Sequence, residues 1–211
     1  MVSELHRQDR RAVVFGGMAG ALALAVGLGC PPQGQCRPAN PRARTLVAAA
    51  RRQIGVTVRY DPGYTALDYP GGDVPRVRGV CTDVVIRAYR DAFQLDLQEQ
   101  VHHDMMAHFR EYPRNWGLAA PDSNIDHRRV PNLQRFWIRS GARLPLPAHA
   151  DGWQPGDIFT ALVSGLPHTG LISDQLGLSG ALKLIHNIGQ GTQEEDVLLL
   201  HRLTGRYRWH L

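Results

Sequence analysis

Apolar residues recur with helical spacing in four segments of the chain. The first follows Asn40, a residue type that caps helices, and Pro41, which suits a first helical turn; it stops at Gly55. A second segment starts at Cys81, a third spans residues 97–109, and a short fourth spans residues 132–140. The apolar positions of the three longer segments are Ala43, Leu46, Val47, Ala50 and Ile54, then Val84, Val85, Ala88, Tyr89 and Ala92, then Leu97, Val101, Met105 and Phe109.

The pattern changes after the turn at residues 153–156. Short apolar runs at residues 157–163, 168–173 and 182–188 are separated by loops that contain glycine, which predicts consecutive antiparallel strands. Residues 205–210 are expected to add a last strand, and residues 197–203 suit a helix or a strand. Helices first and sheet second predict an α+β fold, a single domain over residues 41–211 with N-terminal helices packed on one face of an antiparallel sheet.

The N-terminal segment carries the features of an export signal. Arg7, Arg10 and Arg11 precede an uncharged apolar run over residues 12–29, which predicts a signal peptide over residues 1–30. A retained membrane anchor and twin-arginine export are alternatives. The Pro- and Gly-rich residues 31–40 read as a linker. The expected location is therefore the periplasm or cell envelope.

Cys30 raises a further alternative for this segment. Leu28-Gly29-Cys30 is similar to the end of a bacterial lipoprotein signal, although Gly27 stands where leucine is usual. A lipid on Cys30 would tether the protein to a membrane. Without lipidation, Cys30 and Cys36 are close enough in sequence to pair, and in either case Cys81 is the thiol without an obvious partner.

The net charge of the chain adds little to the predicted fold and location. The chain has 211 residues and a formal net charge of +5, and Lys183 is the only lysine among its 24 basic residues. The arginines are scattered, without the basic tract or interleaved aromatic residues of a nucleic-acid groove, so we expect no nucleic-acid partner. Nothing in the sequence indicates the oligomeric state.

Cys81 is the sharpest candidate for chemistry. A helix N-terminus and a nearby imidazolium both favour the nucleophilic thiolate, and His168 at the start of a strand is the best candidate base. His186, on the next predicted strand, is placed to orient that imidazole. Two alternatives stay open: a buried structural cysteine, or a zinc site made of the same three residues, although the closely spaced ligand pairs of strong zinc motifs are missing.

Four sequence runs point to one family. GVCTDVVIRAY at residues 79–89, NIDHRRVPNL at 124–133, PGDI at 155–158 and IHNIG at 185–189 resemble a bacterial exported family known as domain of unknown function 1287. The resemblance covers nearly the whole chain after residue 45. That family is in turn similar to NlpC-type papain-like cysteine peptidases, many of which cut bonds in cell-wall peptides. The resemblance thus implies a papain-like (NlpC-type) fold.

The resemblance also implies roles for single residues. It matches Cys81 to the nucleophile, His168 to the base and His186 to the polar residue that orients it. Tyr60 looks like the tyrosine that helps to bind the oxyanion, with Tyr64 and Tyr69 as competitors. Asp83 lies two residues after the cysteine, where these enzymes usually have glycine. It would at most support the nucleophile without contacting the substrate. An acidic residue in a first helical turn also has a purely structural explanation, because it complements the helix dipole.

The loop at residues 124–132 has no counterpart in the cell-wall enzymes. Arg128 and Arg129, with Asp126 and His127, would clamp a substrate carboxylate, or else form an internal salt-bridge knot. The resulting hypothesis is an exported cysteine hydrolase that cleaves amide bonds in peptidoglycan peptides and needs no cofactor. A non-catalytic envelope binding module on the same scaffold, or acyl transfer to an amine, are the alternatives.

Overall fold

The computed structural model describes residues 40–211. The predicted signal peptide, the linker up to residue 39 and both N-terminal cysteines lie outside this range. The helices are α1 (Pro41–Arg51), α2 (Cys81–Phe93), α3 (Leu97–His108) and α4 (Val130–Arg139). Single 3-10 turns occur at η1 (Phe109–Glu111), η2 (Asp126–Arg128), η3 (Ala150–Gly152) and η4 (Leu198–Leu200).

Six strands form one antiparallel sheet in the order β3-β8-β4-β5-β6-β7. Their bounds are β3 (Arg143–Leu144), β4 (Ile158–Val163), β5 (Leu166–Leu176), β6 (Leu182–Asn187), β7 (Thr192–Glu195) and β8 (Arg202–Tyr207). A separate parallel pair joins β1 (Arg59–Tyr60) to β2 (Arg78–Gly79). The predicted combination of helices with an antiparallel sheet is confirmed.

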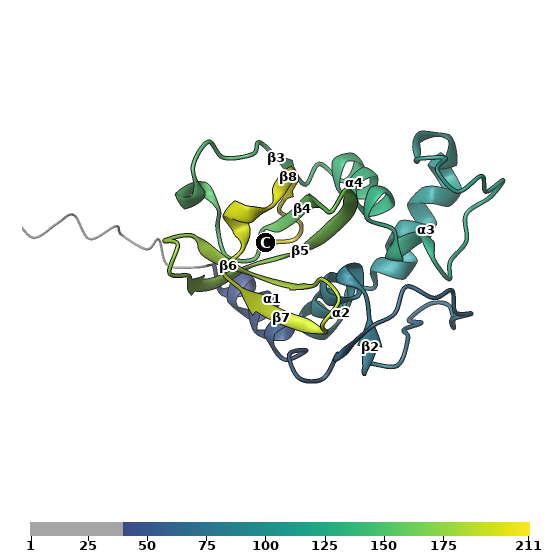
Figure 1. Cartoon of the computed structure of the whole chain (residues 1–211). Coiled ribbons are helices and arrows are strands. Elements are labelled where there is room, and N and C mark those ends of the chain that lie inside the picture. Colours follow the sequence, from purple (N-terminus) through teal and green to yellow (C-terminus); the bar gives the residue numbers. More distant parts are fainter. Residues whose placement is uncertain (1–39) are drawn as a thin grey trace, which may run out of the picture. The chain divides into compact units, whose positions relative to one another are not determined.

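The helices meet the sheet through one of its two faces. Ile158, Leu171 and Ile185 are fully buried with residues of α1, α2, α3 and α4 in one apolar cluster. The alternate residues Phe159, Ile172 and Leu184 belong to a second, smaller cluster with Trp153 and Leu198. This alternation follows from the two-residue period of a strand. Figure 1 shows α1 and α2 beside β5 and β6. Both of these strands contact α2.

Some predicted element boundaries were wrong. Ile54 is 37% exposed, because α1 ends at Arg51 and a tight turn follows it. Helix α4 starts two residues before the predicted Asn132, with Pro131 in its first turn. The ambiguous residues 197–203 divide between η4 and the start of β8, and β7 was not predicted.

The turn between β4 and β5 sets the register of the central strands. Ser164 and Gly165 both have positive φ, 50° and 81°, as tight two-residue hairpins require. Val163 therefore pairs with Leu166, and His168 lies opposite Ala161. One step further, β6 pairs with β5 so that His186 lies opposite Gly170. The hairpin and this second pairing bring the two histidines together.

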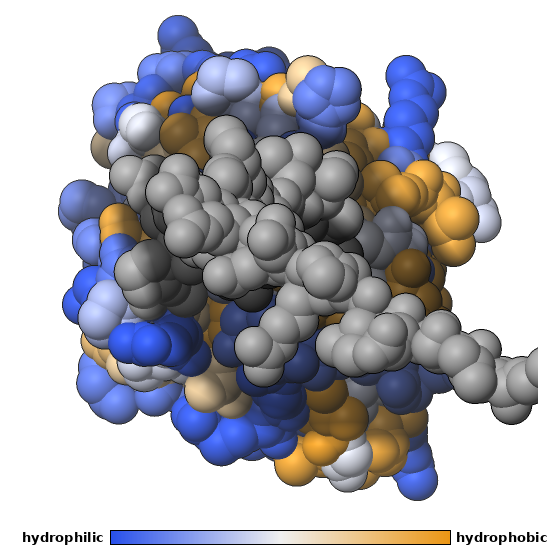
Figure 2. Space-filling view, turned by 90° about the vertical axis from the view of Figure 1, so that its left-hand side faces the viewer, coloured by the Kyte–Doolittle hydropathy of each residue, from blue (hydrophilic) through white to orange (hydrophobic). Residues whose placement is uncertain are grey.

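The outer surface of the described residues is mixed in hydropathy. Figure 2 shows hydrophobic patches separated by hydrophilic side chains on the visible part of one face. Among residues 40–211, none of the helices combines the length and apolar character needed to cross a bilayer.

Asp157, the residue before β4, is a fully buried carboxylate that joins this strand to its neighbour β8. Its oxygens accept hydrogen bonds from Arg206 Nε at 2.7 Å and Arg208 Nε at 2.8 Å. We expect Asp157→Ala to lower the free energy of unfolding by about 3–5 kcal/mol, because it leaves buried positive charge unpaired. Urea unfolding measures this, with exposed Asp151→Ala as the control. Equal stability of both variants would contradict the assignment.

Candidate active site

Cys81 is the first residue of α2 and is 4% exposed. Two contacts hold the preceding chain in place. The Val80 N–H donates to Asp83 Oδ2 at 2.7 Å, and the Asn187 side chain donates to the Gly79 carbonyl at 3.1 Å. The second contact joins the end of β6 to the residues that lead into the helix. The cysteine is thus fixed by the sheet on one side and by its own helix on the other.

The environment of the thiol favours its neutral form. Burial raises the pKa of Cys81 to about 11, and the charge of Asp83 acts in the same direction. The backbone N–H groups of Thr169, Thr82 and Cys81 itself act against this shift, Thr169 most strongly. The N–H groups at the start of α2 thus favour the thiolate, as expected, but desolvation acts more strongly in the opposite direction. Thr169 follows His168 on β5, the strand that packs against α2.

His168 and His186 form a direct hydrogen bond. His168 Nε2 lies 2.8 Å from His186 Nδ1, and both rings are buried. The other nitrogen of His186, Nε2, lies 2.9 Å from Glu195 Oε2 on β7. These three side chains, from β5, β6 and β7, form a continuous line across three neighbouring strands. His168 Nδ1 has no hydrogen-bond partner among the described residues.

Both histidines are neutral at pH 7. Burial lowers the pKa of His168 to about 3, and the neighbouring rings of His186 and His201 act in the same direction. Burial also lowers the pKa of His186, although the carboxylate of Glu195 opposes that shift. The ring of His201 lies 6.2 Å from His168 and 6.0 Å from His186, centroid to centroid. Three imidazoles thus share one poorly hydrated region.

Tyr60 is the tyrosine whose pKa is affected by the charge of Cys81. It pairs with Gly79 in the β1–β2 ladder, two residues before the cysteine. Its pKa is raised by burial first, and then by the charges of Cys81 and Asp83. The competitors have other contacts: the Tyr64 hydroxyl lies 3.0 Å from Asp122 Oδ2, and the Tyr69 ring stacks edge-on against His102. Of the three tyrosines, Tyr60 is thus the one that the β1–β2 pairing holds near the start of α2.

Asp83 and Arg128 form a buried ion pair behind Cys81. Arg128 Nε and Nη2 each donate to one oxygen of Asp83 at 3.0 Å, and the two side chains are 4% exposed or less. Arg128 also donates to the carbonyls of Asp61 and Gly63. The guanidinium is therefore occupied on the side that would bind a carboxylate. These contacts match the internal salt-bridge knot, one of the two interpretations that the sequence left open for this loop.

The neighbouring residues extend this knot. Arg129 donates to Asp126 at 3.2 Å and stacks over the ring of Trp116 at 4.1 Å. His127 is 2% exposed, and burial lowers its pKa to about 4. Asp126 is also buried, and burial raises the pKa of its carboxyl group. Residues 126–128 are therefore buried and Arg129 is half-buried, and the contacts described here are internal to the fold.

The zinc alternative finds no support in the arrangement of the side chains. Within residues 40–211 no group of three or more His, Cys, Asp and Glu side chains is placed to hold a metal ion. His168 Nε2 and His186 Nδ1 face each other, so these two nitrogens are occupied by their own hydrogen bond.

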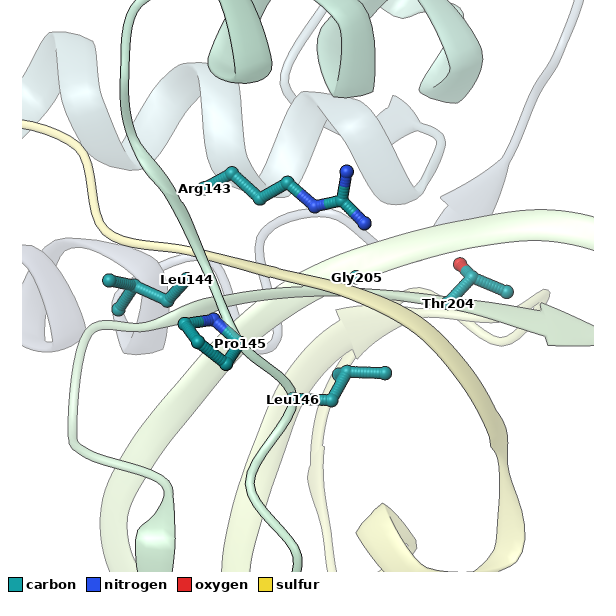
Figure 3. Close-up of a pocket in the computed structure, with 6 residues that line it drawn as sticks. All are labelled: Arg143, Leu144, Pro145, Leu146, Thr204 and Gly205. Carbon is teal, nitrogen blue, oxygen red and sulfur yellow. The ribbon is translucent and has the colours of Figure 1, made fainter.

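A separate pocket lies away from these residues. It has a volume of about 390 Å³ and is lined by residues of β3, β8 and the loop after β3. Figure 3 shows its lining residues, Arg143, Leu144, Pro145, Leu146, Thr204 and Gly205. None of the candidate residues lines it, and β3 lies at the opposite edge of the sheet from β7.

Comparison with known proteins assigns the family. The family model described as Domain of unknown function (DUF1287) matches residues 47–209. The chain belongs to this family. The motif-based prediction of DUF1287 membership is thus confirmed.

Two individual proteins are similar to this DUF1287 protein. Uncharacterized protein YijF of Escherichia coli (strain K12) is 53% identical over 165 residues, which is 78% of this chain and 80% of YijF. A crystal structure of an N-acetylmuramoyl-L-alanine amidase from Bacteroides uniformis ATCC 8492 is 12% identical with a TM-score of 0.48. That match covers 80% of this chain and 98% of the amidase chain.

The sequence analysis did not identify Glu195 and His201, which lie beside the pair of His168 and His186. Glu195 stands in the run QEED, which reads as a solvated polar loop, and β7 itself was not predicted. His201 lies in the stretch of ambiguous secondary structure. Strand alternation on a correctly predicted β7 was the only signal that would have placed Glu195 beside β6.

The burial of Cys81 predicts slow, strongly pH-dependent alkylation in the DUF1287 protein. We expect the rate with iodoacetamide to rise with an apparent pKa well above about 8.5, the ordinary thiol value. Mass spectrometry of the peptide that contains Cys81 separates this reaction from those of Cys30 and Cys36. The same peptide in the urea-unfolded chain is the control and should titrate near 8.5. An apparent pKa below that value in the folded chain would contradict the neutral thiol.

The buried neutral histidines predict that stability falls with acidification. In the unfolded chain histidine binds a proton below about pH 6.5, whereas folded His127 does so only near pH 4 and folded His168 only near pH 3. Each therefore lowers the free energy of unfolding by about 1.4 kcal/mol per pH unit as pH falls from 6 to 5. We expect His127→Gln to remove that much of the slope in urea unfolding. Exposed His103→Gln should leave the slope unchanged, and an equal slope in both variants would contradict the assignment.

Proposed function

We propose that this DUF1287 protein is an exported cysteine hydrolase with an NlpC-type papain-like fold that cleaves amide bonds in cell-wall peptides. One observation carries the proposal. Cys81 begins α2, which packs against β5, and His168 on β5 is hydrogen-bonded through Nε2 to His186. This arrangement supports roles for Cys81 as nucleophile, His168 as base and His186 as orienting group, the three roles that acyl transfer requires. The motif resemblance supplies the cell-wall substrate class.

The reaction would start from a neutral pair. As the Cys81 sulfur bonds to the carbonyl carbon, His168 Nδ1 accepts the thiol proton, so charge separates only when the oxyanion forms. The imidazolium then gives this proton to the leaving amine while the C–N bond breaks, which leaves a thioester on Cys81. Water, deprotonated by His168, hydrolyses the thioester and regenerates the thiol.

The oxyanion would be stabilised by two donors. The Cys81 backbone N–H at the start of α2 is one, and the Tyr60 hydroxyl is the other. A donor of this kind contributes on the order of 3 kcal/mol to transition-state stabilisation. Burial keeps the Tyr60 hydroxyl protonated, since it raises the pKa of that group, and so keeps it a donor.

The proposal extends to the N-terminal residues. A signal peptide over residues 1–30 and a linker over residues 31–40 would deliver the domain at residues 41–211 to the periplasm or cell envelope. A lipid on Cys30 would hold it at the membrane there.

A non-catalytic binding module is the second candidate, and one observation favours it. Cys81 is 4% exposed, and burial raises its pKa to about 11, as expected for a structural cysteine. Such a module would bind cell-wall peptide on the same scaffold without cleaving it.

Incubation of the full-length chain with purified peptidoglycan separates the two candidates. We expect mass spectrometry to detect new amine and carboxyl termini in the stem peptides. Cys81→Ala and His168→Ala should each lower the turnover rate by at least about 10³-fold, as loss of a nucleophile or its base does elsewhere. Exposed His149→Ala is the matched control and should cleave normally. Binding to peptidoglycan without cleavage by the wild-type chain would replace the hydrolase by the binding module.

A further inference from the structure

Glu195 ends a chain of hydrogen-bonding groups that leads through His186 to His168. Its carboxylate lies 2.9 Å from His186 Nε2, and His186 Nδ1 lies 2.8 Å from His168 Nε2. The imidazole of His186 has no exposed surface, whereas the side chain of Glu195 is 41% exposed. The chain of hydrogen bonds therefore runs from the solvent-accessible carboxylate of Glu195, through the buried ring of His186, to Nε2 of His168. The other nitrogen of His168, Nδ1, is the one that the proposed mechanism uses as the base.

The chemistry of these groups fixes where each proton lies. A carboxylate only accepts hydrogen bonds, so His186 must carry its proton on Nε2 to bond to Glu195. Neutral His186 then has a bare Nδ1, which accepts from His168 and requires the proton of His168 to lie on Nε2. Nδ1 of His168 is thereby left unprotonated. This is the nitrogen that would take the proton of Cys81.

The opposite arrangement would disable the base. If His186 carried its proton on Nδ1, His168 Nε2 would have to accept that hydrogen bond. The proton of neutral His168 would then lie on Nδ1, which would face Cys81 as a donor. In serine proteases a tautomer error of this kind lowers kcat by about 10⁴-fold.

No other group that contacts the two rings determines which nitrogen carries the proton. His186 meets the ring of Phe159 on β4, the ring of His168 on β5 and the ring of His201 after η4, in addition to Glu195 on β7. His201 makes no hydrogen bond to either ring within residues 40–211, and its buried Nε2 has no partner there. Glu195 is thus the only acidic hydrogen-bond partner of the pair in the described part of the chain.

We propose that Glu195 is a positioning residue that sets the tautomers of both His186 and His168, and so makes Nδ1 of His168 the base. This inference rests on the proposed hydrolase. It adds a fourth member to the site, on a strand next to the one that carries His186, and it assigns that member a task that packing alone would not require.

Nitrogen-15 NMR of the full-length chain at pH 7.5 tests the tautomers directly. In the wild type we expect both His168 and His186 to carry the proton on Nε2. In Glu195→Ala we expect His186 to lose this preference, and kcat on peptidoglycan peptides to fall about 10- to 100-fold with KM unchanged, a smaller loss than for a direct member of the triad. Formate should restore part of kcat in Glu195→Ala, because the vacated position is open to solvent. A structural side chain would not be replaced by formate.

Gln193→Ala is the matched control. Gln193 lies on the same strand and pairs with His186 through the backbone, but its side chain bonds only to the carbonyl of Gln190. We expect wild-type tautomers and wild-type kcat for this variant.

The outcomes distinguish this inference from the proposed function. A His186 protonated on Nδ1 in the wild type overturns the role of Glu195, even if Glu195→Ala does not fold. Unchanged tautomers and unchanged kcat in Glu195→Ala overturn it as well. If the wild-type chain cleaves no amide bond but the tautomers respond to Glu195 as stated, the tautomer assignment holds and the hydrolase proposal fails.

Discussion

The buried ion pair between Asp83 and Arg128 is the constraint on which the rest of the site depends. Asp83 caps the first turn of α2 and at the same time neutralises an arginine that binds two carbonyls of the loop after β1. Removing either partner would leave an unpaired charge in a desolvated place, at a cost of about 3–5 kcal/mol. The positions of Tyr60, Cys81 and the 124–132 loop are coupled through this pair.

Burial decides the protonation states in this site more than any single charge does. It keeps both the thiol of Cys81 and the ring of His168 neutral, although a helix N-terminus and several N–H groups favour a thiolate. A neutral pair is less reactive toward simple alkylating agents than a preformed ion pair. A substrate that excludes the remaining water and supplies an oxyanion would shift the proton only during the reaction.

The sequence predicted the parts of the site that depend on local signals. The start of α2 at Cys81 followed from helical periodicity, and the neighbouring positions of His168 and His186 followed from consecutive strands separated by loops that contain glycine. Long-range contacts escaped prediction for a physical reason. Whether Arg128 faces a ligand or Asp83, 45 residues away, depends on how a loop without periodicity folds back. The raised pKa of the Cys81 thiol likewise depends on burial, which one segment of sequence does not determine.

The last strand of the sheet combines two tasks. β7 has only four residues, and at its half-buried C-terminal end it carries the adjacent carboxylates of Glu194 and Glu195. A short edge with charged side chains is a poor template for a strand from another molecule, which discourages aggregation through the open side of the sheet. The acidic residues that bond to Arg51 and His186 therefore also protect this edge. A substitution there would affect the solubility of the protein as well as its chemistry.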